Sequence, residues 1–89
     1  MKITANMRQF AARREMELEV TEVEGVEFLT IWQEYDDGAE PVVKYRIGKN
    51  GVLALRQYTD QRGEDWPAHV ESWDQLKTII RYAHEVAPA

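Results

Sequence analysis

Residues 42–58 alternate apolar and polar side chains in two β-favouring runs, with Lys49-Asn50-Gly51 between them. An Asn-Gly dipeptide between two such runs is typical of a β-hairpin. A two-residue turn would place the leucines of the second run beside basic side chains of the first. A three-residue loop, with Gly51 in the left-handed conformation, instead collects the apolar side chains on one face, so we predict this register. It gives the cross-strand pairs Ile47–Leu53, Tyr45–Leu55 and Val43–Gln57.

The same alternation predicts an earlier hairpin, formed by strands over residues 16–23 and 26–35 with a tight turn at Glu24-Gly25. The register that unites its apolar residues on one face pairs Val20 with Leu29 and Leu18 with Ile31.

The composition of residues 36–41, Asp-Asp-Gly-Ala-Glu-Pro, predicts a loop before the third strand. Continuing the apolar face across this loop places Ile31 beside Ile47. The same register brings together two further pairs, Glu34 with Lys44 and Trp32 with Arg46.

Two segments have helical periodicity. Residues 4–14 repeat apolar side chains at helical spacing, with Thr4 as a possible N-cap and no acidic residue at Met7 to complete a capping box. After a polar connection over residues 59–71, Ser72 is predicted to cap the final helix, with Gln75 completing a capping box. The apolar stripe of this helix comprises Trp73, Leu76, Ile79, Ile80, Ala83 and Val86.

These elements predict an α+β fold in a single domain, residues 1–89. It is a four-stranded antiparallel β-meander with a C-terminal helix packed on one face and a short N-terminal helix. A helix of about ten residues is marginal alone, so the N-terminal helix must dock. One placement lets Ile3, Met7 and Phe10 cover Phe28 and Trp32 on the second face, and the other leaves that face open. The residues predicted to lie beneath the final helix are Leu18, Val20, Leu29, Ile31, Tyr45, Ile47, Leu53 and Leu55.

The chain has no cysteine, so disulfides and thiolate metal sites are excluded. Its net charge is -5. No stretch approaches membrane-spanning length, and no apolar signal follows Met1, so we expect a cytoplasmic protein. Charge is uneven: cations follow the later strands, whereas six glutamates crowd the first hairpin. These glutamates are Glu15, Glu17, Glu19, Glu22, Glu24 and Glu27.

The residues offer little for catalysis. Ser72 is the only serine and is explained as a cap, and His69 and His84 lack the spacing of zinc ligands. The run at 36–38 lacks the alternating ligands of a calcium loop. Asp60, Glu64 and Asp65 lie in a polar segment where both acid and base would be solvated. We therefore expect no enzyme activity, no metal and no cofactor.

The face opposite the final helix combines aromatic, acidic and basic side chains, a composition that suits protein hot spots. We expect a small acidic regulatory protein that occupies the surface of another macromolecule, in the first place a protein. Stacking of single-stranded nucleic acid is the alternative, and a homodimer is a further possibility. In size and charge the chain resembles phage-encoded inhibitors of nucleic-acid-handling complexes, anti-CRISPR proteins among them. The expected contact residues are Glu17, Glu19, Phe28, Trp32, Lys44, Arg46, Arg56 and Tyr58.

A second resemblance covers residues 55–77. Leu55-Arg56-Gln57-Tyr58, a polar loop with Gly63 and Pro67, and Trp73-Asp74-Gln75-Leu76-Lys77 resemble the end of the positive-cofactor-four coactivator family. That resemblance implies a four-stranded sheet followed by a helix and a dimer that binds single-stranded DNA. Arg56 would contact the nucleic-acid backbone, and Trp73 would pack the helix. The basic Gly-Arg-Lys-Gly element of the family is replaced by Ala68-His69-Val70.

Overall fold

The structure, a computed structural model, describes residues 1–58 and 66–85. The fold is α+β, as predicted, with two helices on an antiparallel sheet. The sheet has five strands in the order β1-β2-β3-β4-β5, so the predicted four-stranded meander is extended by one short strand. The elements are α1 (Ala5–Ala12), β1 (Met16–Val23), β2 (Val26–Tyr35), β3 (Gly38–Ile47), β4 (Leu53–Tyr58), β5 (His69–Val70) and α2 (Trp73–Glu85).

The first hairpin has the predicted strands, turn and register. Glu24 and Gly25 both have positive φ, 51° and 81°. Such a two-residue turn matches the right-handed twist of the flanking strands. The predicted pairs of Val20 with Leu29 and Leu18 with Ile31 are confirmed.

The predicted loop over residues 36–41 is wrong. The connection is a two-residue turn, because β3 already begins at Gly38. The φ of Gly38 is 143°, a conformation that glycine adopts readily. Ile31 therefore pairs with Val43, and Ile47 pairs with Glu27. A bulge beside Val42 accommodates the strand proline, since prolines are tolerated at such interruptions of the ladder. The other two predicted pairs are also wrong: Trp32 lies opposite Pro41, and Glu34 lies opposite Ala39.

The second hairpin has the predicted loop. Gly51 is left-handed (φ 84°), and the backbone N–H of Gly48 donates to the Val52 carbonyl at 2.9 Å. The pairs of Ile47 with Leu53 and Tyr45 with Leu55 are confirmed. A bulge then shifts the register by one residue, so Val43 lies opposite Tyr58 and not opposite Gln57.

The last strand was missed within the predicted connection. In β5, Val70 pairs with Leu53 and His69 pairs with Ala54. Two residues are too few for an alternation to show in the sequence. Val70 is fully buried, so this short strand closes the core at the β4 edge.

Both helices begin at the predicted caps. The Thr4 hydroxyl accepts the Met7 N–H at 3.3 Å, and the Met7 sulfur accepts the Thr4 N–H in place of the absent acid. The Ser72 hydroxyl accepts the Gln75 N–H at 3.2 Å, while the Gln75 side chain accepts from the neighbouring Glu71 N–H.

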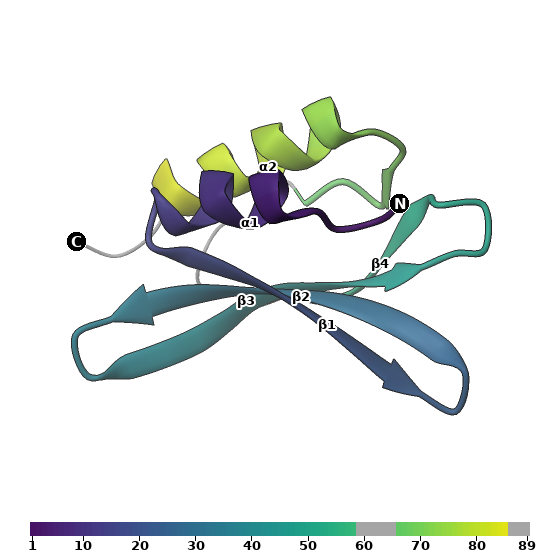
Figure 1. Cartoon of the computed structure of the whole chain (residues 1–89), viewed down its shortest axis with the longest axis horizontal. Coiled ribbons are helices and arrows are strands. Elements are labelled where there is room, and N and C mark those ends of the chain that lie inside the picture. The colour runs from purple at the N-terminus through teal and green to yellow at the C-terminus, as the bar shows by residue number, and fades with distance from the viewer. Residues whose placement is uncertain (59–65, 86–89) are drawn as a thin grey trace.

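Both helices lie on the same side of the sheet (Figure 1). Phe10 of α1 meets Trp73 of α2 edge to face, with ring centroids 5.3 Å apart. Arg14 lies over the Phe10 ring at 3.8 Å. The predicted placement in which α1 covers Phe28 and Trp32 is therefore wrong, because the helix finds its apolar partner in α2.

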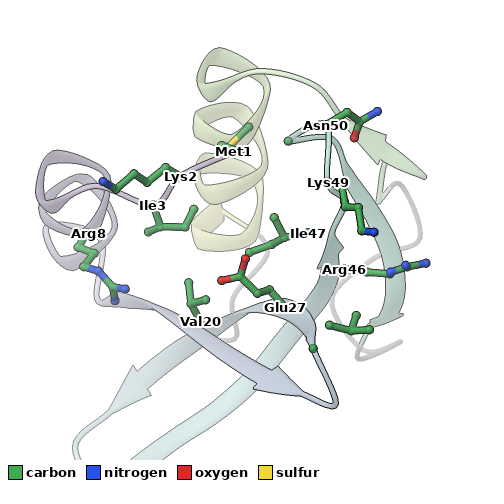
Figure 2. Close-up of a pocket in the computed structure, with 14 residues that line it drawn as sticks. Met1, Lys2, Ile3, Arg8, Val20, Glu27, Arg46, Ile47, Lys49 and Asn50 are labelled. Carbon is green, nitrogen blue, oxygen red and sulfur yellow. The ribbon is translucent and has the colours of Figure 1, made fainter.

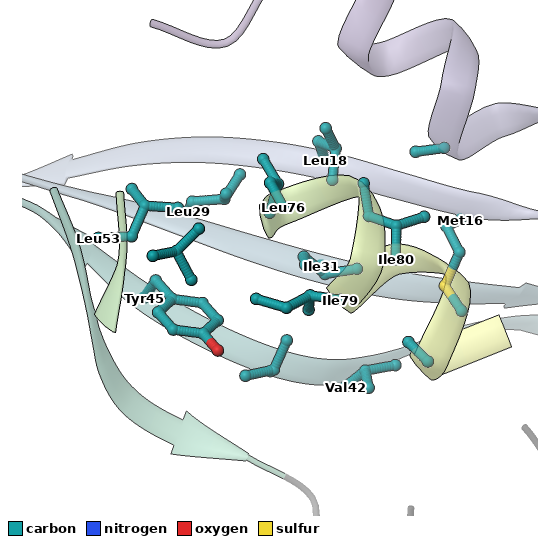
Figure 3. Packing of buried hydrophobic residues seen from close by; sticks show 14 of the residues in the cluster. Met16, Leu18, Leu29, Ile31, Val42, Tyr45, Leu53, Leu76, Ile79 and Ile80 are labelled. Carbon is teal, nitrogen blue, oxygen red and sulfur yellow. The ribbon is translucent and has the colours of Figure 1, made fainter. Parts of the chain in front are cut away.

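The core fills the space between the helices and the sheet. Leu76, Ile79 and Ile80 of α2 lie over the buried strand residues (Figure 3). Five of the eight strand residues predicted for the core are fully buried: Leu18, Leu29, Ile31, Tyr45 and Leu53. The other three, Val20, Ile47 and Leu55, are partly buried against them. Val86, predicted for the stripe of α2, lies outside the described residues.

Candidate functional site

The open face is the side of the sheet opposite α1 and α2, and none of the helices and strands that the structure describes covers it (Figure 1). Side chains alternate along a strand, so the residues between the core positions belong to this face. On β1 and β2 they pair as Glu17 with Trp32, Glu19 with Thr30 and Thr21 with Phe28. On β3, Lys44 lies opposite Thr30 and Arg46 lies opposite Phe28.

Two contacts preorganise the open face. The Trp32 Nε1–H donates to Glu19 Oε1 at 3.2 Å, and Lys44 Nζ lies 4.7 Å from the centroid of the Phe28 ring. Each contact joins an aromatic residue of β2 to a charged residue on a neighbouring strand. Both therefore hold a charged group against a ring, which reduces the side-chain freedom that binding would otherwise remove.

The open face is hollowed beside these contacts. Thr30, only 7% exposed, is among the residues that line this hollow of about 320 Å³. The hollow is also lined by Glu19, Trp32, Lys44 and Tyr58, so four predicted contact residues meet there. The prediction that Tyr58 shares the face of Lys44 is wrong, because the β3–β4 bulge places this tyrosine, 44% exposed, opposite the buried Val43.

Charge on the open face is balanced and arranged in stripes. Glu17 and Glu19 lie on β1, whereas Lys44 and Arg46 lie on β3, so the acidic and basic pairs cancel. The aromatic residues of β2 lie between them. The open face thus changes from acidic through aromatic to basic across three neighbouring strands.

Four of the eight predicted contact residues do not line this hollow: Glu17, Phe28, Arg46 and Arg56. The first three still occupy open-face positions of the ladder, whereas Arg56 does not. The β3–β4 bulge pairs Lys44 with Gln57 and leaves Arg56 without a cross-strand partner on β3. Gln57 and Pro41 also line the hollow, and neither was predicted to do so. The position of Gln57 depends on the bulge, which leaves no trace in the alternation, and Pro41 was assigned to a loop.

A second hollow, of about 750 Å³, lies between the N-terminal segment and the ends of the hairpins. Figure 2 shows Ile47 and Glu27 near its middle, Arg8 on one side and Lys49 on the other. The Arg8 guanidinium also donates to the Leu18 carbonyl. The basic side chains that line this second hollow lie on its opposite sides and do not converge on a point where one anion could bind. This hollow therefore lacks the convergent polar groups of a ligand site.

Tyr45 is a buried titratable residue in the core of the described structure. Burial raises the pKa of the Tyr45 phenol well above its ordinary value, and the phenol donates to the Pro67 carbonyl at 3.0 Å. This tyrosine has 0% exposure and no access to a substrate. Within residues 1–58 and 66–85 no group of three or more His, Asp or Glu side chains could hold a metal ion. Asp60, Glu64 and Asp65 lie outside these residues.

Among the helices that the structure describes, none has the length and apolarity needed to cross a membrane. Comparison with protein families, curated proteins and solved structures finds no match to this chain. The resemblance of residues 55–77 to the positive-cofactor-four family therefore gains no support from these comparisons. Trp73 does pack the final helix, as that resemblance implies, through its contact with Phe10.

Proposed function

We propose that this protein is a non-enzymatic binding protein that docks its open face onto the surface of a partner protein. The observation that carries the proposal is an aromatic, charge-balanced sheet face left uncovered while both helices pack on the other side. Tryptophan, tyrosine and arginine dominate the energy of protein interfaces, and Trp32 and Arg46 supply two of these types on the open face.

Charge favours a protein over single-stranded nucleic acid. Strands that bind nucleic acid present a surplus of cations to the phosphates. On the open face, Glu17 and Glu19 offset Lys44 and Arg46. The Glu19 carboxylate also lies against the Trp32 ring edge, where a stacked base would bring its phosphate. A partner surface with charges of both signs suits this pattern better.

A sharper form of the proposal concerns the first hairpin. Among residues 1–58 and 66–85, no cation lies within ion-pair distance of its six glutamates. Such an acidic surface attracts a basic partner over long range and accelerates association. We therefore include among the candidate partners the basic groove of a nucleic-acid-handling complex, which this hairpin would occupy as an inhibitor.

The experiment is photo-crosslinking from the open face in extract of the source cell. A benzophenone residue at Gln57 or Thr21 reports on the open face, and the same residue at Arg13, the C-cap of α1, reports on the helical side. We expect one protein to be crosslinked from the open-face positions only. The crosslink should be lost when Trp32→Ala is added, while circular dichroism shows an unchanged fold.

Equal crosslinking from Arg13, or crosslinking that persists without Trp32, would refute the proposed face. A labelled single-stranded oligonucleotide titrated at low salt tests the alternative. Salt-sensitive binding that is lost in Lys44→Ala and Arg46→Ala would replace the protein partner by nucleic acid.

A further inference from the structure

The charge pattern of the open face is complementary to itself. Residues at one level of the sheet form a row across the strands, and the middle row reads Glu19, Thr30, Lys44. Its acidic and basic ends are equally spaced from β2, since neighbouring strands lie about 4.8 Å apart. If the row is turned over about β2, its acidic end meets the basic end of an identical row.

We propose that the open face binds a second copy of this chain as a face-to-face homodimer whose two-fold axis runs along β2. The inference rests on the proposed function, in which this face docks a protein, and it names the occupant. Glu19 of each copy then faces Lys44 of the other. Thr30 faces its own counterpart on the axis, between the two symmetric charge contacts.

The flanking rows fit the same axis. One row reads Glu17, Trp32, Pro41 and the other reads Thr21, Phe28, Arg46. The axis along β2 stacks the two Trp32 side chains near each other and the two Phe28 side chains near each other. Aromatic residues thus form the centre of the interface, and the charges of β1 and β3 lie toward its sides, as in protein interfaces generally.

Charge also selects this axis over the alternative. An axis perpendicular to the strands at the middle row would lay β1 on β1 and β3 on β3. It would bring Glu19 against the Glu19 of the second copy and Lys44 against the Lys44 of the second copy. Like charges that face each other at an interface weaken association. The axis along β2 avoids both repulsions.

The size of the open face suits a reversible dimer. An axis along β2 lays β1, β2 and β3 of one copy on β3, β2 and β1 of the other, and β4 lies outside the overlap. Three strands of about eight residues measure about 14 Å by about 26 Å, or about 370 Å² in projection for each copy. Two copies bury about twice that area, which is the size of a weak, transient interface and agrees with a dimer that forms only at high concentration.

The test is a charge exchange followed by sedimentation velocity from about 1 μM to about 1 mM. We expect concentration-dependent dimers of the natural chain. Glu19→Lys and Lys44→Glu should each weaken self-association at least about tenfold, because each places like charges at both contacts. An equimolar mixture of the two variants should restore a dimer containing one copy of each, since both contacts are then attractive. Native mass spectrometry identifies this mixed species.

Arg13→Glu at the C-cap of α1 and Glu71→Lys before α2 are the matched controls, because both change charge on exposed side chains outside the open face. They should leave the dimer unchanged. A natural chain that stays monomeric throughout, or variants that fail to recover on mixing, would overturn the homodimer. If Trp32-dependent crosslinking to another protein persists in that case, only this inference fails. If that crosslink is absent too, the proposed function fails with it.

Discussion

Replacing Tyr45 by phenylalanine isolates one buried hydrogen bond and one buried ionisable group. The ring has 0% exposure, and its hydroxyl donates to the Pro67 carbonyl at 3.0 Å. Phenylalanine keeps the packing of the ring and removes only the oxygen. A neutral hydrogen bond contributes about 1 kcal/mol to stability, so we expect Tyr45→Phe to lower the free energy of unfolding by about 1 kcal/mol at pH 7.

The effect of Tyr45→Phe on the free energy of unfolding should change sign at alkaline pH. Burial raises the pKa of Tyr45 in the folded protein, whereas in the unfolded chain the phenol ionises near pH 10. Above pH 10 the unfolded state releases a proton that the native state retains. The stability contributed by the neutral phenol is thus complete below pH 10 and falls by up to about 1.4 kcal/mol per pH unit above it.

Tyr45→Phe lacks this dependence, so the two stability curves should converge above pH 10 and cross near pH 11. Urea unfolding monitored by far-ultraviolet circular dichroism, at intervals from pH 7 to about pH 11.5, measures the free energy of unfolding of both proteins. Contributions from all other groups are shared by the two chains. Curves that stay parallel above pH 10 would show that Tyr45 ionises equally easily in both states and refute the reasoning.

Three further substitutions test the fold. Leu29→Ala removes a fully buried side chain from the centre of the sheet, and chemical denaturation should show a loss of about 2–5 kcal/mol. Gly51→Ala should cost about 1–2 kcal/mol in the same assay, because φ is 84° and the new Cβ would lie 2.6 Å from the Met1 nitrogen; an unchanged midpoint would contradict the loop geometry. Ser72→Ala removes the oxygen that accepts the Gln75 N–H and should lower stability by about 1 kcal/mol, measured as a lower melting temperature, whereas Ser72→Asp should retain it.

The hairpins could be predicted because apolar alternation and turn residues agree there. Glu24-Gly25 and Lys49-Asn50-Gly51 each fix a loop length, and a slip of one residue would turn the buried side chains outward. The helix caps at Thr4 and Ser72 were equally local signals, set by residues three apart.

The errors arose where tertiary contacts decide. Pro41 was the reason for predicting a loop, but the β2–β3 bulge allows a proline within the strand. The apolar stripe of α1 showed that the helix docks, but it carried no information about which face of the sheet it chooses. That choice depends on the contact of Phe10 with Trp73, two residues far apart in the sequence.

The candidate site divides in the same way. Alternation placed Glu17, Glu19, Phe28 and Trp32 on one face, and the structure keeps them together. The pairing of Trp32 with Glu19 depends on rotamers that the sequence does not reveal. The position of Arg56 depends on a bulge with equally little sequence signature.

The hydrogen bond of Arg8 to the Leu18 carbonyl has a consequence for aggregation. β1 is one of the two outer strands of the sheet. The Glu15 carbonyl accepts the Glu34 N–H of β2, and because carbonyls alternate in direction along a strand, the Leu18 carbonyl points away from β2. An outer strand with free carbonyls is a template for cross-chain pairing and fibril growth. The arginine occupies one of the acceptors that an incoming strand would need, so it opposes edge-to-edge pairing along β1 while the open face stays available.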